Sequence, residues 1–238
     1  MTNSLARQDD SRRRRLTGWA AVAVASLAGL ALAAEPIAAA RPAPPEDPEA
    51  FLAEPTALVA DIVGEVIVIL QNSDLSTRER RQRIENLAFD VFDFPTMGKL
   101  VLARNWKKFD DAQRREFIEQ FKLYLSRNYG SRLDRYRQTD VVIVGARIEP
   151  RNDVTVYSKV AGGEFDGVKL DYRLRQRSAE WKVIDVVIEG VSLVGNFRSQ
   201  FREVVSQKGP EALLEQMRAK NARPEPDQAD AETAEASS

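Results

Sequence analysis

The chain contains neither cysteine nor histidine among its 238 residues. Their absence excludes disulfide bonds, zinc sites made of Cys or His, and nucleophilic catalysis by a Ser-His-Asp or Cys-His arrangement. A basic surplus is also lacking, because the formal charge at pH 7 is −1. Proteins that bind nucleic acids normally carry such a surplus, so we expect no nucleic-acid partner.

The sequence offers little other catalytic chemistry. Asp185 and Glu189 could form a carboxylate pair, but four strand residues separate their Cα atoms by roughly 13 Å, too far for glycoside hydrolysis. Ser192 lies in the segment GVSLVG, which only partly matches a nucleophile elbow and has no histidine base. We therefore predict no enzyme activity, cofactor or metal. The expected ion-pair partners of the two acids are Arg173, Arg175 and Arg198.

The amino terminus has the layout of an export signal. Arg12 to Arg15 form a positive segment, and an apolar run follows from Trp19 to Ala34. Small residues at 31–33 and 38–40 suit signal cleavage. The run is shorter than the roughly 20 residues of a membrane-spanning helix, and a retained anchor is the alternative. We expect residues 1–40 to be cleaved after export by a Sec or a twin-arginine route.

Composition divides the rest of the chain into three parts. Residues 41–48 are rich in proline and predict a linker. Residues 49–220 carry the periodic apolar patterns of one folded domain. Residues 221–238 are acidic and have no large apolar side chain, so we expect a disordered tail.

Apolar residues at helical spacing predict four helices in the first half of the domain. The first runs from Pro55 to Gln71, and the second opens with a capping box from Ser76 to Glu79. Phe94-Pro95 ends the second helix and precedes a short third one. The fourth begins at Asp110 and carries an aromatic stripe, which either packs in a core or lines a cavity.

From Val141 onward the period changes to that of strands. Strands are predicted at 141–148, 154–160, 168–175 and 181–188, followed by a helix from Phe197 and a short last helix after Gly209-Pro210. Residues 181–188 are apolar on both faces, which indicates a strand covered on both sides. Strict alternation places Trp181, Val183, Asp185 and Val187 opposite Ile184, Val186 and Ile188. The order predicts an α+β fold with an antiparallel sheet of four to five strands.

Two segments carry a family resemblance. They are FPTMGKLVLARNWKKFDDAQRREFIEQFKLYLSRNYGSRLDRY, which begins at Phe94, and WKVIDVVIEGVSLVGNFRSQF, which begins at Trp181. The most specific parts are Asp185, residues 189–192 and residues 198–201. Over roughly residues 50–220 the chain resembles the periplasmic lipid-binding component of the Mla (maintenance of lipid asymmetry) system. This family is also called the toluene-tolerance auxiliary component of an ABC transporter.

The resemblance implies a periplasmic phospholipid carrier. In the family, an N-terminal helical layer packs on a curved antiparallel sheet and, with C-terminal helices, encloses an apolar pocket for acyl chains. The implied partners are an outer-membrane lipoprotein–porin complex and an inner-membrane ABC transporter with an MCE-domain ring. Such transport would maintain the lipid asymmetry of the outer membrane. Two tails with about 30 methylenes, at about 0.8 kcal/mol each, need shielding worth over 20 kcal/mol.

The strand and helix periods predict which side chains line such a pocket. The strand candidates are Val156, Leu170, Tyr172, Leu174, Ile184, Val186 and Ile188. The helix candidates are Met97, Val101, Phe121 and Leu125. For each of them, plain core packing is the alternative.

Three other interpretations stay open. A sibling branch of the family, associated with hopanoid-producing gene clusters, has the same pattern and implies a hopanoid-associated carrier. A periplasmic adaptor without a pocket would instead dock other proteins. Its surface would be the arginine-rich face of the second helix, which otherwise is a solvated face: Arg78, Arg80, Arg81 and Arg83. An enzyme on a related cone-shaped fold is the third, and it conflicts with the missing His and Cys.

Overall fold

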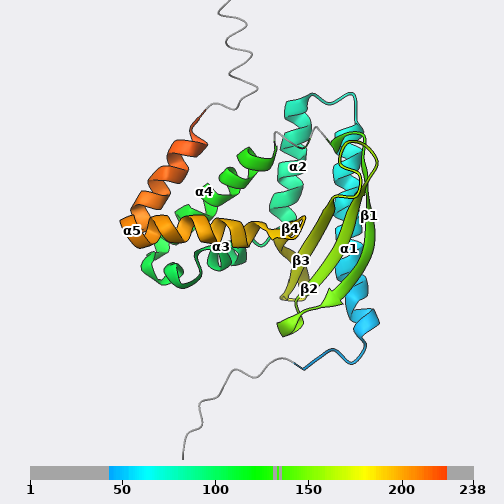
Figure 1. Ribbon diagram of the computed structural model, residues 1–238, viewed down its shortest axis with the longest axis horizontal. Helices are drawn as coiled ribbons and strands as arrows, with labels where there is room; N and C mark the ends of the chain where they lie inside the picture. Colours follow the sequence, from blue (N-terminus) through cyan, green and yellow to red (C-terminus); the bar gives the residue numbers. More distant parts are fainter. Residues whose placement is uncertain (1–42, 131–132, 134–135, 224–238) are drawn as a thin grey trace, which may run out of the picture. The chain divides into compact units, whose positions relative to one another are not determined.

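A computed structural model describes residues 43–130, 133 and 136–223 (Figure 1). The predicted export signal at 1–40 and residues 224–238 of the predicted acidic tail lie outside this range. Within the described part of the chain, no helix is both long and apolar enough to cross a membrane.

The first helix, α1 (Pro48–Gln71), begins earlier than predicted. Asp47 caps it, because its Oδ1 accepts hydrogen bonds from the backbone N–H groups of Glu49 and Ala50, both at 3.0 Å. Pro48 occupies the first turn, where a missing N–H costs nothing. Pro55 therefore lies inside the helix rather than at its start. The segment predicted as a linker ends where this cap begins.

Three further helices and a 3-10 turn follow: α2 (Thr77–Val91), α3 (Phe94–Leu102), η1 (Ala103–Lys108) and α4 (Asp111–Tyr129). The capping box at Ser76 and Glu79 is confirmed, and Asp110 forms a second one with Gln113. The prediction that the arginines of α2 form a solvated face is wrong for Arg80, which is only 4% exposed. Its guanidinium donates to the backbone oxygens of Asn72 and Leu75 and to Thr77.

The described residues form a five-stranded antiparallel sheet in the order β1-β2-β3-β4-β5. Its strands are β1 (Asp140–Ile148), β2 (Val154–Ala161), β3 (Lys169–Arg177), β4 (Glu180–Ile188) and β5 (Val191–Ser192), with a short turn, η3 (Pro150–Asn152), between β1 and β2. The predicted α+β class and antiparallel sheet are confirmed, and the longer strands curve together (Figure 1).

A bulge in β4 overturns the strict alternation predicted for that strand. Arg173 of β3 pairs with Asp185, but the next residue of β3, Leu174, pairs with Val183. Ile184 is therefore the extra residue on β4, and it shifts the side-chain period by one. As a result Val183 and Val186 belong to the same face and to the same apolar cluster.

The last helix, α5 (Leu193–Asn221), starts earlier than the predicted Phe197. Ser192 caps it by accepting a hydrogen bond at 2.9 Å from the backbone N–H of Gly195. The predicted stop and restart at Gly209-Pro210 is present as a kink, with Gly209 at φ 83°. That value lies in the left-handed region that glycine adopts without strain.

The main apolar side chains gather in two separate clusters. The helical cluster joins α3, α4 and α5 and includes Met97, Phe121 and Phe201. The sheet cluster joins α1 to one face of β2, β3 and β4 and includes Val59, Val156 and others. Figure 1 shows α1 lying along the sheet, with α3 and α5 drawn on its other side. We call the sheet face that packs on α1 the inner sheet face.

Candidate functional site

Cross-strand pairs place side chains of three strands, all but Ser158 apolar or aromatic, in rows on the inner sheet face. The rows across β2, β3 and β4 are Val154–Leu174–Val183, Val156–Tyr172–Val186 and Ser158–Leu170–Ile188. On β3 and β4 burial falls from the first row to the third, whereas Ser158 on β2 stays buried. Every residue of the first row is at most 1% exposed, whereas Leu170 and Ile188 in the third row are half-buried. The face is therefore closed at one end and accessible at the other.

Helix α1 closes the buried end. Val59 and Val63 of α1 are buried against the inner sheet face. Near the start of α1, the ring of Phe51 meets Trp181 of β4 edge to face, with centroids 5.3 Å apart. Such pairs add to the stabilisation that area burial alone gives. The contacts fix the amino-terminal part of α1 on the sheet.

Tyr172 lies in the middle row, between the closed and the accessible ends. Burial raises the pKa of its hydroxyl to about 12, because the surroundings penalise a charged phenolate. Its hydroxyl forms no hydrogen bond with any residue that the structure describes. Tyr172 as a whole is half-buried, and its hydroxyl is not among the fully buried polar atoms that lack a partner.

The opposite face of the sheet carries charges instead. Arg175 of β3 donates to both carboxylate oxygens of Asp153, at 2.7 and 2.6 Å, and this pairing raises the pKa of Arg175. Partial burial raises the pKa of Asp171. The face opposite α1 thus carries charges on β3, whereas on β4 the same face carries the buried Asp185 and Val187, which pair with Arg173 and Asp171.

The predicted partners of Asp185 and Glu189 are correct only in part. Asp185 lies 3.6 Å from a guanidinium nitrogen of Arg173. Arg175 pairs with Asp153, as above, and the guanidinium of Arg198 donates to the backbone oxygen of Leu100 at 2.8 Å. The carboxylate of Glu189 accepts a hydrogen bond from the backbone N–H of Lys169 at 2.5 Å. Both acids act in the architecture of the sheet edge.

The predicted pocket residues divide between the two clusters. Val156, Tyr172, Leu174, Val186 and Ile188 belong to or pack against the sheet cluster. Leu170 shares their face but is not packed against the cluster, and Ile184 is the bulged residue. The four helix candidates belong to or pack against the helical cluster instead: Met97, Val101, Phe121 and Leu125.

The structure adds α1 to the site, which the pocket prediction omitted. Phe51, Val59 and Val63 of α1 and Ile143 of β1 belong to or pack against the sheet cluster. The signal was present in the sequence, because α1 is apolar on most of its circumference and so must be covered on several sides. Periodicity does not reveal which face meets the sheet.

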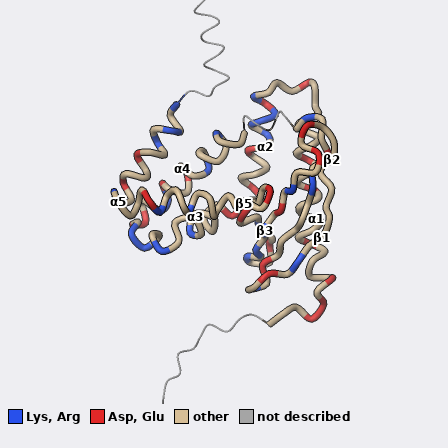
Figure 2. The backbone as a smooth tube through the Cα atoms, in the orientation of Figure 1, with Lys and Arg blue, Asp and Glu red and all other residues tan. Residues whose placement is uncertain are grey.

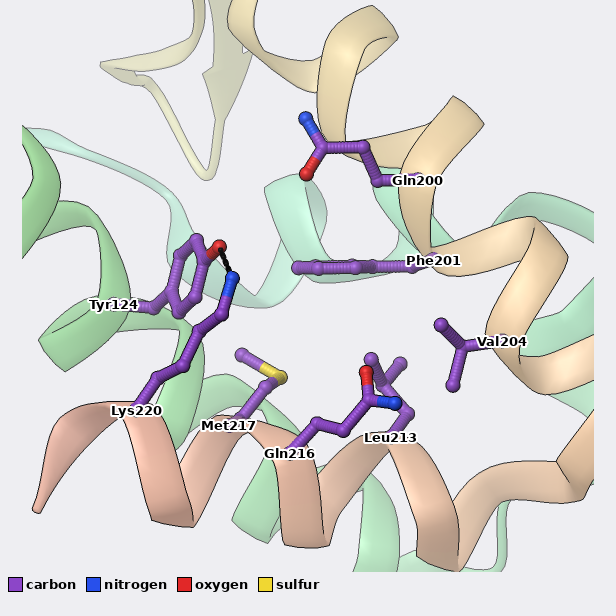
Figure 3. Close-up of a pocket in the computed structure, with 8 residues that line it drawn as sticks. All are labelled: Tyr124, Gln200, Phe201, Val204, Leu213, Gln216, Met217 and Lys220. Carbon is purple, nitrogen blue, oxygen red and sulfur yellow. Dashed lines mark hydrogen bonds between the residues drawn. The ribbon is translucent and has the colours of Figure 1, made fainter.

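A small cavity lies elsewhere, between α4 and the two arms of α5 (Figure 3). Its volume is about 110 Å³, well below the roughly 300–1,000 Å³ of ordinary ligand pockets. Lys220 crosses one side of it and donates to the hydroxyl of Tyr124 at 2.9 Å. None of the predicted pocket residues lines this cavity, which is too small for acyl chains. Its lining is Tyr124, Gln200, Phe201, Val204, Leu213, Gln216, Met217 and Lys220.

Comparisons with known proteins agree with the resemblance predicted from the sequence. The toluene tolerance protein ttg2D of Pseudomonas putida is 28% identical over 120 residues, which are 50% of this chain and 56% of that protein. The match thus spans little more than half the length of that relative. A solved structure of the phospholipid-binding protein from Ralstonia solanacearum, in complex with a phospholipid, is similar with a TM-score of 0.63 and 27% identity. The similarity covers 70% of this chain and 96% of that one.

A protein-family comparison covers most of the domain. The model described as MlaC protein matches residues 60–219, a range that runs from α1 almost to the end of α5. It includes both segments on which the sequence resemblance was based, and the predicted family is confirmed. The chain belongs to the MlaC protein family.

Proposed function

We propose that the protein is a periplasmic carrier that holds phospholipid acyl chains against the inner sheet face, beside α1. The observation that carries the proposal is the likeness to the Ralstonia protein, whose structure contains a phospholipid and is covered over 96% of its length. The inner sheet face supports it, because its accessible end is lined by apolar side chains of Leu170 and Ile188. Acyl chains gain about 0.8 kcal/mol for each methylene that is shielded from water.

The arrangement suits binding without chemistry. The accessible end would receive the acyl chains, and the hydroxyl of Tyr172 would meet an ester or phosphate oxygen at the boundary with water. We further propose that the carrier exchanges lipid with an outer-membrane lipoprotein–porin complex and an inner-membrane MCE-domain ABC transporter, and so maintains outer-membrane lipid asymmetry. A hopanoid in place of the phospholipid would use the same apolar face.

The test is to place an amide at the accessible end of the inner sheet face. A double variant, Leu170→Gln and Ile188→Gln, would set two polar groups against the acyl chains, at about 1–3 kcal/mol each. We expect at least a tenfold loss of phospholipid that co-purifies with the protein from the cell envelope, measured by native mass spectrometry and lipid extraction.

The matched control is Val142→Gln on β1. Val142 is 51% exposed, so the same amide there meets water and should leave the lipid content unchanged. Circular dichroism and thermal unfolding establish that all the variants are folded. A folded double variant with the lipid content of the unmodified protein would contradict the proposed site. If hopanoid rather than phospholipid co-purified with the unmodified protein, the proposed ligand would change but the proposed site would not.

A further inference from the structure

A second surface, far from the inner sheet face in the fold, has a strong local charge. From Phe94 to Phe109 the chain has no acidic residue, although the whole chain carries a charge of −1. Figure 2 shows basic residues gathered on the turn that follows α3. We call this surface the basic turn: Lys99, Arg104, Lys107 and Lys108, with Trp106 between them.

The basic turn is firmly anchored. Leu102 and Phe109, on either side of it, are at most 2% exposed and belong to the helical cluster. The guanidinium of Arg198 on α5 holds the backbone oxygen of Leu100. Arg114 of α4 donates twice to the backbone oxygen of Trp106, at 3.3 and 3.2 Å. The turn therefore presents its cations from a fixed backbone.

Trp106 supplies the aromatic part of the surface. Its ring is half-buried against the helical cluster. Lys99 Nζ lies 5.8 Å and the guanidinium carbon of Arg114 5.3 Å from the ring centroid. Both distances suit a cation–π interaction. A tryptophan flanked by cations is typical of surfaces at a membrane–water interface.

The four cations of the basic turn are not neutralised by the rest of the molecule. Two acids follow closely, but Asp110 caps α4 and Asp111 pairs with Arg114 at 2.7 Å. Lys99, Arg104, Lys107 and Lys108 form no ion pair with any described residue, and all four are exposed. Their charge is therefore free to attract an anionic partner.

We propose that the basic turn docks the protein on the surface of a membrane that contains anionic phospholipids. Three of its four cations are lysines, which are depleted at protein–protein interfaces, whereas lysine and tryptophan together are common at lipid surfaces. The apolar ring of Trp106 is partly covered, so attraction is mainly electrostatic and reversible. Docking of this kind goes beyond acyl-chain binding, because η1 contacts α3 and α5 rather than the inner sheet face.

The test measures co-sedimentation of the envelope-purified protein with vesicles. Vesicles of phosphatidylcholine alone are compared with vesicles that contain phosphatidylglycerol. We expect binding to the anionic vesicles only, with loss at about 1 M salt, where the screening length falls to about 3 Å. The triple variant Arg104→Gln, Lys107→Gln and Lys108→Gln should bind about 100-fold more weakly, because each cation near such a surface contributes about fivefold.

The control variant removes the same charge elsewhere: Arg78→Gln and Arg83→Gln on α2, and Lys159→Gln on β2. All three residues are exposed, and this variant should bind like the unmodified protein. Equal losses in both triple variants would overturn the proposal, and so would unchanged binding of the basic-turn variant. If the basic-turn variant lost binding to a protein partner but still bound the vesicles, that result would also overturn the proposal. Co-purifying lipid should be unchanged in the basic-turn variant, which separates this test from that of acyl-chain binding.

Discussion

At the scale of single residues, Tyr172 lies between the closed and the accessible ends of the inner sheet face. It pairs with Val156 on one side and Val186 on the other, and burial raises its pKa to about 12. An ordinary tyrosine has a pKa of about 10. The folded protein therefore keeps Tyr172 protonated at pH values at which the unfolded chain ionises it.

This pKa difference predicts a loss of stability at alkaline pH. Below about pH 10 the hydroxyl is protonated in both states and contributes no pH dependence. Between about pH 10 and 12 the unfolded chain ionises while the folded protein stays protonated, so the free energy of unfolding falls by about 2–3 kcal/mol. Chemical unfolding at a series of pH values measures the decrease, and Tyr172→Phe should remove that part of it.

The comparison variant is Tyr157→Phe, a tyrosine on β2 whose place in the strand puts it on the opposite face. It should leave the alkaline decrease of the unmodified protein in place. If Tyr172→Phe shows the same pH dependence as Tyr157→Phe, Tyr172 is not buried as described. Lysines and the remaining tyrosines also titrate near and above pH 10. The quantity to compare is therefore the difference between the two variants in how the free energy of unfolding changes with pH.

At the scale of elements, the junction of β4 with α5 rests on Asp185. This residue is 3% exposed. One carboxylate oxygen accepts the backbone N–H of Val194 at 3.0 Å, and the other accepts the hydroxyl of Ser192 at 2.5 Å. Ser192 in turn caps α5. Asp185 therefore fixes the direction in which α5 leaves the sheet.

Removing this carboxylate should destabilise the whole junction. Asp185→Ala would leave the N–H of Val194 and the hydroxyl of Ser192 without their acceptor, which we expect to lower the free energy of unfolding by about 2–4 kcal/mol. Urea unfolding measures the change. Glu180→Ala is the control on the same strand, because its side chain is 71% exposed beside Lys182. That substitution should cost less than about 1 kcal/mol, and equal costs for the two would contradict the role of Asp185.

The sequence predicts most elements, but some boundaries depend on contacts it does not reveal. The capping box at Ser76 follows from local residue types alone, and it is found as expected. The bulge at Ile184 is set by pairing between β3 and β4, so strict alternation misassigned the faces of β4. The predicted start of α1 is wrong because proline favours the first turn of a helix, and Pro48 rather than Pro55 occupies that turn, after the cap at Asp47.

At the scale of the whole molecule, apolar patterning predicts that residues are buried but not which cluster they join. Tyr172 and Ile188 and the aromatic Phe121 all show strong periodicity, yet Phe121 packs among the helices and the other two lie by the inner sheet face. Periodicity alone assigns both groups to one pocket. Only the chain path, with α1 over the sheet and α3 to α5 packed together, separates them.

This separation makes the proposal specific: we propose that acyl chains lie against the inner sheet face, beside α1. The most direct measurement uses a phospholipid with a photoreactive group on its acyl chain, exchanged into the protein and activated by light. Labelled peptides are then mapped by mass spectrometry. We predict labels on α1, β3 and β4, including residues near Leu170 and Ile188. Labels concentrated on α4 and α5 around the cavity of Figure 3, or an absence of labelling, would contradict the account.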